Sequence, residues 1–346
     1  MLPSSAITPK VAIRPAMIGV LLTALCIGGL ITYKASAALR TLAKARVTGT
    51  LAPKAEWIPT GSLSAAAKPF VGTVNYFSWV LIALLFGIVL GALVRALIPQ
   101  QWLARTIGAP GPRGVFTAAI AGAPLMLCSC CVAPLFDGVY SRTRRLGPAL
   151  SLMFAAPGLN PAAITLTFLL FSPRVAWARL LLSALIVLVA SLALGRLTPG
   201  HVAPTNCAID DPAPDFPSLV RSFVRSLGEV AWRTLPAIIL GALVSMALMQ
   251  HVALSSIAAA APVGLTVIIA AIAVVVALPT FGEIPIALAL QAAGAPTSAV
   301  VAVLVAGPIV NLPSLATLAR SVSLKAAVAT AAAVFAVTVV GSALLA

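Results

Sequence analysis

Charged residues are scarce in this sequence, and acidic residues are scarcer still. Of 346 residues, 8% are charged and 61% are hydrophobic, and Asp and Glu together number only 7. A soluble domain usually carries about 25% charged residues. A helix that spans a bilayer, by contrast, needs about 20 mostly apolar residues. The composition therefore excludes a large soluble domain and predicts an all-α, polytopic membrane protein of the cytoplasmic membrane.

Several motifs that specific chemistries require are also missing. No lysine follows a glycine, which excludes a Walker A phosphate-binding loop. The chain has two histidines and no His-Glu pair, which excludes the helix of a zinc protease. Five cysteines are too few and too unevenly placed for a disulfide framework. We therefore expect a protein that is not an enzyme and that holds no cofactor.

Basic residues outnumber acidic ones by 22 to 7, but their placement does not suggest nucleic acid. They cluster in short connectors, such as Arg142, Arg144 and Arg145, without interleaved aromatic side chains. Lys and Arg that flank membrane helices give this pattern. The expected partners are the lipid bilayer and a small solute, with no nucleic acid, while a homo-oligomer is left open.

Polarity divides the chain into five parts. An N-terminal transmembrane anchor is predicted in residues 1–39 and a polar connector in residues 40–74. Two repeats, 75–197 and 227–346, flank a polar linker at 198–226. About nine apolar stretches result: 15–33, 77–98, 114–135, 148–171, 175–197, 231–250, 257–280, 285–307 and 325–346.

The two halves of the chain repeat each other. The segment LGALV at residues 90–94 recurs at residues 240–244. Prolines and an asparagine then recur 151 residues apart: Pro134, Pro157 and Asn160 correspond to Pro285, Pro308 and Asn311. Internal duplication is typical of secondary transporters, whose binding sites lie between the repeats. The sequence thus predicts a site at the interface of two repeats.

The same prolines predict broken helices, because proline removes a backbone donor and clashes with the preceding turn. We expect breaks at Pro134, Pro157, Pro285 and Pro308, either in discontinuous spanning helices or in re-entrant hairpins.

Asn160 and Asn311 follow two of these breaks. Their amides can donate and accept, so both are candidates to line a shared cavity and bind substrate. The alternative is that each one only caps its own helix.

Three cysteines lie within four residues, at Cys128, Cys130 and Cys131. On a regular helix Cys130 would point away from the other two, so convergence of all three requires the chain to unwind before Pro134. Soft thiolates select soft metals and metalloids, so these residues are predicted to bind substrate, as metal ligands if the solute is a soft metal ion. C-x-x-C redox chemistry is the alternative.

Two carboxylates stand inside apolar surroundings. Glu283 is a candidate for proton coupling, because an intramembrane carboxylate is costly and usually functional. Its alternative position is the water boundary. Asp137 lies near Arg142 and Arg144 in the sequence and is expected to pair with them.

Cys128-Ser129-Cys130 with Pro134, followed by AAPGLNPA at residues 155–162, resembles the ArsP-like predicted permeases. The resemblance covers about residues 75–346 and departs at Cys131, where the family usually has glycine. It implies a multi-span permease that exports trivalent organoarsenicals or, in some branches, divalent metals, with Cys128 and Cys130 in contact with substrate.

These observations together predict a permease that exports a small thiophilic solute, a trivalent organoarsenical or a soft metal ion, through a site between the repeats. The alternative function is a membrane thiol-redox protein that uses the same cysteines for electron or disulfide transfer.

Overall fold

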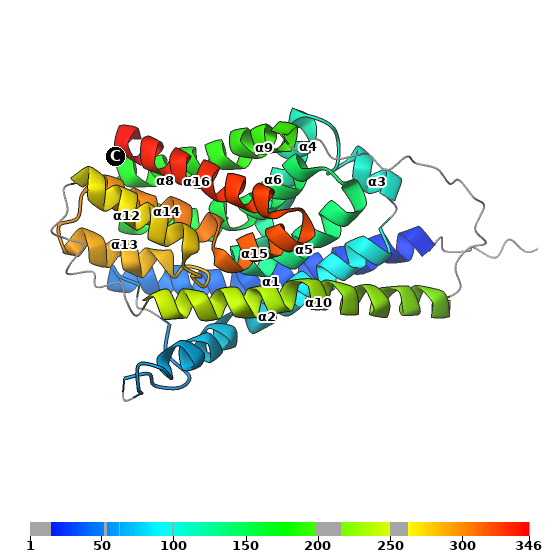
Figure 1. Ribbon diagram of the computed structural model, residues 1–346, viewed down its shortest axis with the longest axis horizontal. Coiled ribbons are helices and arrows are strands. Elements are labelled where there is room, and N and C mark those ends of the chain that lie inside the picture. Colours follow the sequence, from blue (N-terminus) through cyan, green and yellow to red (C-terminus); the bar gives the residue numbers. More distant parts are fainter. Residues whose placement is uncertain are drawn as a thin grey trace, which may run out of the picture.

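The computed structural model describes residues 15–51, 54–61, 63–98, 100–197, 216–249 and 262–345, and all regular structure in these ranges is helical (Figure 1). Most of the expected linker, residues 198–215, lies outside the described residues. The first half contains α1 (Pro15–Thr48), α2 (Lys68–Ala96), α3 (Gln100–Arg105), α4 (Pro112–Gly122), the 3-10 turn η1 (Ala123–Leu125), α5 (Ser129–Thr143), α6 (Leu146–Gly158), α7 (Pro161–Leu170), α8 (Pro173–Leu185), the π turn η2 (Ile186–Ala190) and α9 (Ser191–Leu197). The second half contains α10 (Phe216–Met249), α12 (Pro262–Val275), α13 (Glu283–Ala292), α14 (Thr297–Ile309), α15 (Leu312–Ser321) and α16 (Leu324–Leu345).

The helices confirm an all-α, polytopic membrane protein. Five of the described helices are long and apolar enough to cross a membrane, and the number rises to 7 if each of two bent pairs is one span. The bent pairs are α6 with α7, at 40°, and α14 with α15, at 42°. Some apolar stretches of the sequence run through a break, because loops in a membrane protein can stay apolar. Thus 114–135 covers α4, η1 and the start of α5, and 285–307 covers parts of α13 and α14.

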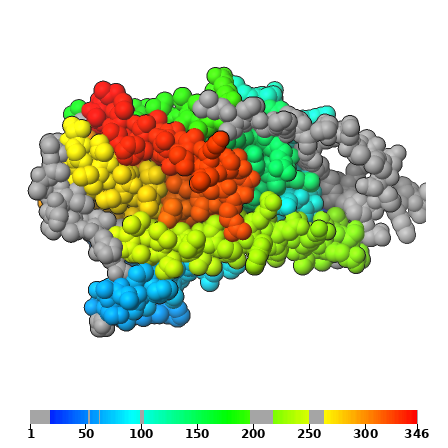
Figure 2. Space-filling model, viewed as in Figure 1, coloured from blue at the N-terminus to red at the C-terminus, as the bar shows by residue number. Residues whose placement is uncertain are grey.

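The duplication is visible in the helix boundaries. The pair α6 and α7 begins and ends 151 residues before the pair α14 and α15, and α8 begins 151 residues before α16. The halves also interlock, since α2 packs against α10 and α8 packs against α14 and α16. Figure 2 shows α10, α15 and α16 side by side on one face of the molecule. In contrast to these helices, α6 is buried over its whole length, and it contacts α4, α5, α9 and α14.

The polar connector is shorter than residues 40–74, because helix enters it from both sides. The first helix continues to Thr48 and α2 begins at Lys68. Arg40 and Lys44 therefore lie on a helix, where the sequence predicted a connector.

Glycine lets α2 approach α5 closely. A Cβ at Gly87 would meet the carbonyl oxygen of Cys131, and a Cβ at Gly91 would meet that of Pro134. Small residues at helix contacts allow this backbone approach in membrane proteins. The fit of α2 against α5 therefore fixes the turn that carries the cysteines.

We expect Gly87→Ala to lower the melting temperature of the detergent-purified protein and to expose Cys131 to thiol reagents, because the new methyl group must displace the α5 backbone. Gly28→Ala on α1 is the matched control, since nothing lies within 4 Å of a Cβ at that position. Equal melting temperatures and equal labelling of the two variants would refute the close contact.

Candidate functional site

The cysteines lie where α4 stops and the chain restarts as α5. Pro124 is in the first turn of η1 and cannot donate to a continuing helix. Met126 then takes a left-handed conformation with φ of 50°, which turns the chain. Cys128 is extended, at φ −76° and ψ 162°, and is the N-cap of α5. The three cysteines thus straddle a helix start, with Cys130 and Cys131 in its first turn.

All three sulfur atoms converge. Cys128 Sγ lies 2.7 Å from Cys131 Sγ and 3.2 Å from Cys130 Sγ, and the third separation is 3.7 Å. All exceed the roughly 2.05 Å of a disulfide bond, and the thiols are free and buried. Convergence comes from the left-handed turn at Met126 and the extended N-cap at Cys128, so the chain is non-helical before Pro134, as the convergence of all three sulfurs requires. That proline lies inside α5 and marks no break.

Helix α2 closes the thiol cluster from one side. The Tyr76 hydroxyl lies 2.7 Å from Cys130 Sγ, and Tyr76 is fully buried. A buried tyrosine hydroxyl normally has a hydrogen-bond partner, and here the partner is a thiol. Tyr76 was not among the residues predicted from the sequence, although a tyrosine at the start of an apolar stretch is a signal for such a partner.

A small cavity adjoins Cys128 and lies between the two halves. The first half contributes Leu127, Cys128, Pro157, Asn160 and Ala163, and the second half contributes Leu278, Pro279, Thr280, Phe281, Glu283 and Pro308. Its volume is about 10 Å³, which is room for about one water molecule. A larger solute therefore needs these walls to move apart.

The two asparagines both cap helices, and one of them also reaches the cavity. Asn160 Oδ1 accepts from the backbone N–H groups of Ala162, at 3.0 Å, and Ala163, at 3.3 Å, at the start of α7. Asn311 Oδ1 accepts from Ser314 N at 3.1 Å, in a reciprocal capping box at the start of α15. The structure places Asn160 in the cavity wall, whereas Asn311 is absent from it. The breaks expected at Pro157 and Pro308 fall just after these prolines, at the two asparagines.

Asn160→Ala and Asn311→Ala are each expected to lower the free energy of unfolding by about 1 kcal/mol, because each removes a helix cap. Only Asn160→Ala should also slow transport, since only Asn160 lines the cavity. Denaturation of both variants, with transport measured at equal membrane levels, would test this. An equally large transport defect in Asn311→Ala would contradict the assignment.

Glu283 is buried beside the thiols and paired with arginine. It is 2% exposed, begins α13 and accepts a hydrogen bond from Arg179 Nη2 at 2.8 Å. Arg179, on α8, is fully buried and also donates through Nη1 to Thr167 Oγ1 at 2.6 Å. The Glu283 carboxylate is therefore shielded from solvent by protein and neutralised by an arginine of the other half. Pro285 lies in the first turn of α13, so it marks a helix start.

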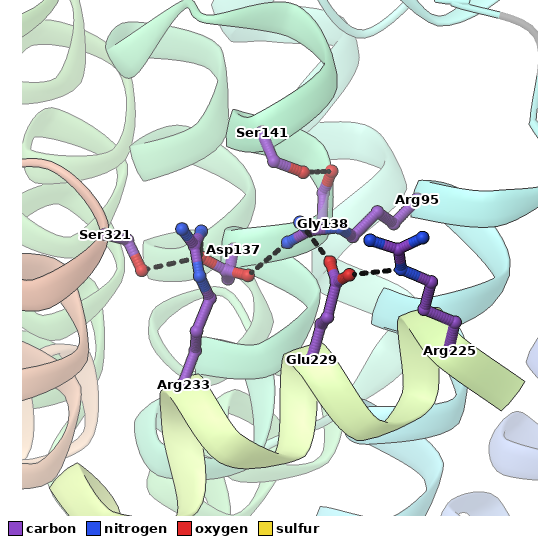
Figure 3. A network of polar contacts seen from close by, with 8 residues as sticks. All are labelled: Arg95, Asp137, Gly138, Ser141, Arg225, Glu229, Arg233 and Ser321. Carbon is purple, nitrogen blue, oxygen red and sulfur yellow. Dashed lines mark hydrogen bonds and ion pairs between the residues drawn. The ribbon is translucent and has the colours of Figure 1, made fainter. Parts of the chain in front are cut away.

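A second polar network lies further along α5 (Figure 3). Asp137 Oδ1 accepts from Ser321 at 2.7 Å, and its carboxylate pairs with Arg95 at 3.5 Å and Arg233 at 3.6 Å. Arg95 also pairs with Glu229 at 2.6 Å. The expected pairing of Asp137 with Arg142 and Arg144 is wrong. Asp137 is buried and takes partners from other helices, whereas Arg142 donates to the carbonyl of Ile98.

This network ties the halves together. It joins α2 and α5 of the first half to α10 and α15 of the second. Asp137 follows Cys131 by six residues on α5, which is about 9 Å along the helix axis. Charged contacts between the halves thus occur on two levels, beside the thiols at Arg179 and Glu283 and further along α5 at Asp137.

Broken helices beside a cavity between two duplicated halves are typical of membrane transport proteins. The chain belongs to the ArsP-like family of predicted permeases, whose sequence model matches residues 68–346.

Two curated relatives share parts of the sequence. The UPF0718 protein YraQ of Escherichia coli is 34% identical over 189 residues, which cover 52% of this chain and 53% of the relative. The UPF0718 protein MJ0584 of Methanocaldococcus jannaschii is 25% identical over 122 residues, which cover 35% and 33%. The chain thus spans about half or less of the length of the curated relatives it matches. No solved structure matches the chain.

Proposed function

We propose that this permease exports a small thiophilic solute, a trivalent organoarsenical or a soft metal ion, which binds at Cys128, Cys130 and Cys131. The observation that carries the proposal is the convergence of three buried sulfur atoms at the boundary between the two halves. Their ligand atoms lie within 4.8 Å of one another, close enough to share one ligated atom. Thiolates prefer soft metals and metalloids over hard cations.

The local backbone favours the thiolate form that such ligation needs. The cluster lies at the start of α5, and the positive end of a helix dipole stabilises a nearby anion. Cys128, as the N-cap, lies closest to the cavity, because it is the one cysteine of the three in the cavity wall.

The broken helices supply the movable parts. The cavity is closed around Cys128 by Pro157 and Asn160 from one half and by Phe281 and Pro308 from the other. Release of a solute requires these ends to separate, and separation of the halves at a central site is how alternating-access transporters work. Protonation of Glu283 would weaken its pairing with Arg179, which connects export to the proton gradient.

The redox alternative is supported by one observation. Cys128 Sγ and Cys131 Sγ lie 2.7 Å apart in a C-x-x-C arrangement, so a disulfide between them needs little movement. A redox protein would cycle between the dithiol and this disulfide with a partner protein. A permease, by contrast, moves solute when it is alone in a vesicle.

Purified protein in sealed vesicles separates the two functions. The proposal expects Cd²⁺ to cross the bilayer only when the protein is present, and phenylarsine oxide, which is neutral and crosses a bilayer unaided, to cross faster with the protein than without it. The cysteines are kept reduced in both measurements. Efflux should stop when N-ethylmaleimide has alkylated the cluster. No protein-dependent flux of either solute, together with a reversible Cys128–Cys131 disulfide, would support the redox function instead.

A further inference from the structure

The N-terminal helix α1 packs directly on the cavity. Ala38 of α1 is buried in a small apolar cluster with Met126 and Ala162, and Ile31 and Ala35 pack against the same cluster. Met126 lies two residues before Cys128, and Ala162 lies in the first turn of α7. Phe281, which lines the cavity, completes the cluster. This helix precedes residue 68, where the match to the permease family begins.

Lys34 lies on the face of α1 that meets the site. Residues 31, 34, 35 and 38 are spaced by three and four, so they share one side of the helix. Lys34 is half-buried, and its Nζ donates to Thr280 Oγ1 at 3.4 Å. Thr280 is itself part of the cavity wall. The ammonium group of Lys34 therefore lies at the edge of the cavity, against a neutral partner.

Lys54 reaches the same region from the connector between α1 and α2. The connector is fastened to α2 by Trp79, whose Nε1 donates to the carbonyl of Ala55 at 2.9 Å, and by Asn75, which bonds both backbone groups of Ile58. Tyr76, which contacts Cys130, lies between these two anchor residues on α2. Lys54 is the neighbour of Ala55, so the fastening fixes the backbone beside it.

The surroundings of Lys54 agree with this placement. Its side chain keeps contact with solvent, yet burial among protein atoms lowers the pKa of its ammonium group. The charge of Cys128 acts in the opposite direction and Lys34 adds to the lowering, so the pKa responds to both the thiols and the other lysine.

The fixed charges near the cavity do not balance. Glu283 is the one carboxylate among the described residues of the cavity wall, and Arg179 already neutralises it. No described carboxylate of the cavity wall is therefore left to neutralise the positive charges of Lys34 and Lys54. While the cysteines are neutral thiols, such an arrangement attracts anions and repels free cations over several ångströms.

We propose that Lys34 and Lys54 form a cationic entrance to the thiol site, which selects a thiophilic solute that also carries a negative charge. The proposal rests on the proposed function, and it narrows the substrate class to acidic trivalent organoarsenicals rather than free metal cations. Each thiol that binds replaces an As–O bond of the arsenic(III) centre with an As–S bond, and its proton leaves with that oxygen as water. The lysines attract the acidic group of the same molecule.

Two probes that share an arsenic(III) centre but differ in charge distinguish attraction by the lysines from binding by the thiols. Phenylarsine oxide is neutral, and 4-carboxyphenylarsine oxide carries a carboxylate at neutral pH. Binding of each is measured on the purified full-length chain, in wild type and in Lys34→Gln, Lys54→Gln and the double variant. Lys34→Arg tests whether charge alone suffices, and Lys44→Gln, on an exposed position of α1, is the matched control.

The wild type should bind the acidic probe more tightly than the neutral probe. The double variant should bind the acidic probe about tenfold more weakly than the wild type does. Affinity for the neutral probe should stay within about twofold in every variant, and Lys34→Arg and Lys44→Gln should resemble the wild type. An equal loss for both probes, or no loss for either, overturns the cationic entrance and leaves the thiol site standing. If neither probe binds the wild type, the thiol site itself is refuted, and the charge preference with it.

Discussion

Replacing Cys128 and Cys130 together with serine is expected to abolish export while the protein still folds in the membrane. Serine keeps the approximate size of cysteine, but its hard oxygen loses affinity for soft atoms. The packing of α2 on α5 should remain, because it depends on the close backbone approach at Gly87 and Gly91 rather than on the sulfurs. Transport in everted vesicles should fall to the level of vesicles without the protein.

Cys26→Ser is the matched control, since Cys26 is a half-buried residue of α1 that is no part of the cluster. It should transport like the wild type. Normal transport by the double variant, at equal membrane levels, would show that the thiols do not form the site.

Breaking the buried pair of Arg179 and Glu283 is expected to give the second large effect. Removing one partner of a buried ion pair leaves an uncompensated charge and typically costs about 3–5 kcal/mol of stability. Glu283→Gln and Arg179→Met should therefore each destabilise the protein strongly. The double variant Arg179→Met/Glu283→Met should be more stable than either single variant, because no buried charge is left unpaired.

Arg225 provides the comparison for this prediction. Its pair with Glu229 is a surface contact with the arginine side chain 81% exposed, so Arg225→Ala should cost less than about 1 kcal/mol. Denaturation in detergent measures all four variants. A double variant as unstable as the worse single variant would mean that packing, not charge, dominates the site. If Glu283 couples export to protons, a folded Glu283→Gln should also transport without responding to an imposed pH gradient.

The parts of the fold that were predictable from sequence depend on local patterns. The duplicated breaks at Pro157 and Pro308 were visible because proline and asparagine recur at one offset inside apolar stretches, and a helix ends just after each of these two prolines. The same pattern failed at Pro134, which lies inside α5. The thiol cluster was visible because its members are neighbours in the chain. Its geometry was not, since the extended N-cap at Cys128 depends on the left-handed turn at Met126.

The contacts that escaped sequence reasoning join residues far apart in the chain. Arg179 and Glu283 are separated by 104 residues, and no periodicity connects them. Asp137 was assigned the arginines nearest in sequence, yet its carboxylate meets Arg95 and Arg233, which lie on other helices. The contact of Lys34 with the cavity wall likewise depends on how α1 packs, which its apolar composition does not reveal.

Arsenic X-ray absorption on the purified protein with bound phenylarsine oxide tests the central claim most directly. The measurement counts the sulfur atoms bonded to arsenic, independently of transport. The thiol site predicts two or three sulfur neighbours in the wild type and in Cys26→Ser, and fewer in the double variant of Cys128 and Cys130. Arsenic without sulfur neighbours in a wild-type protein that still transports the compound would contradict the account.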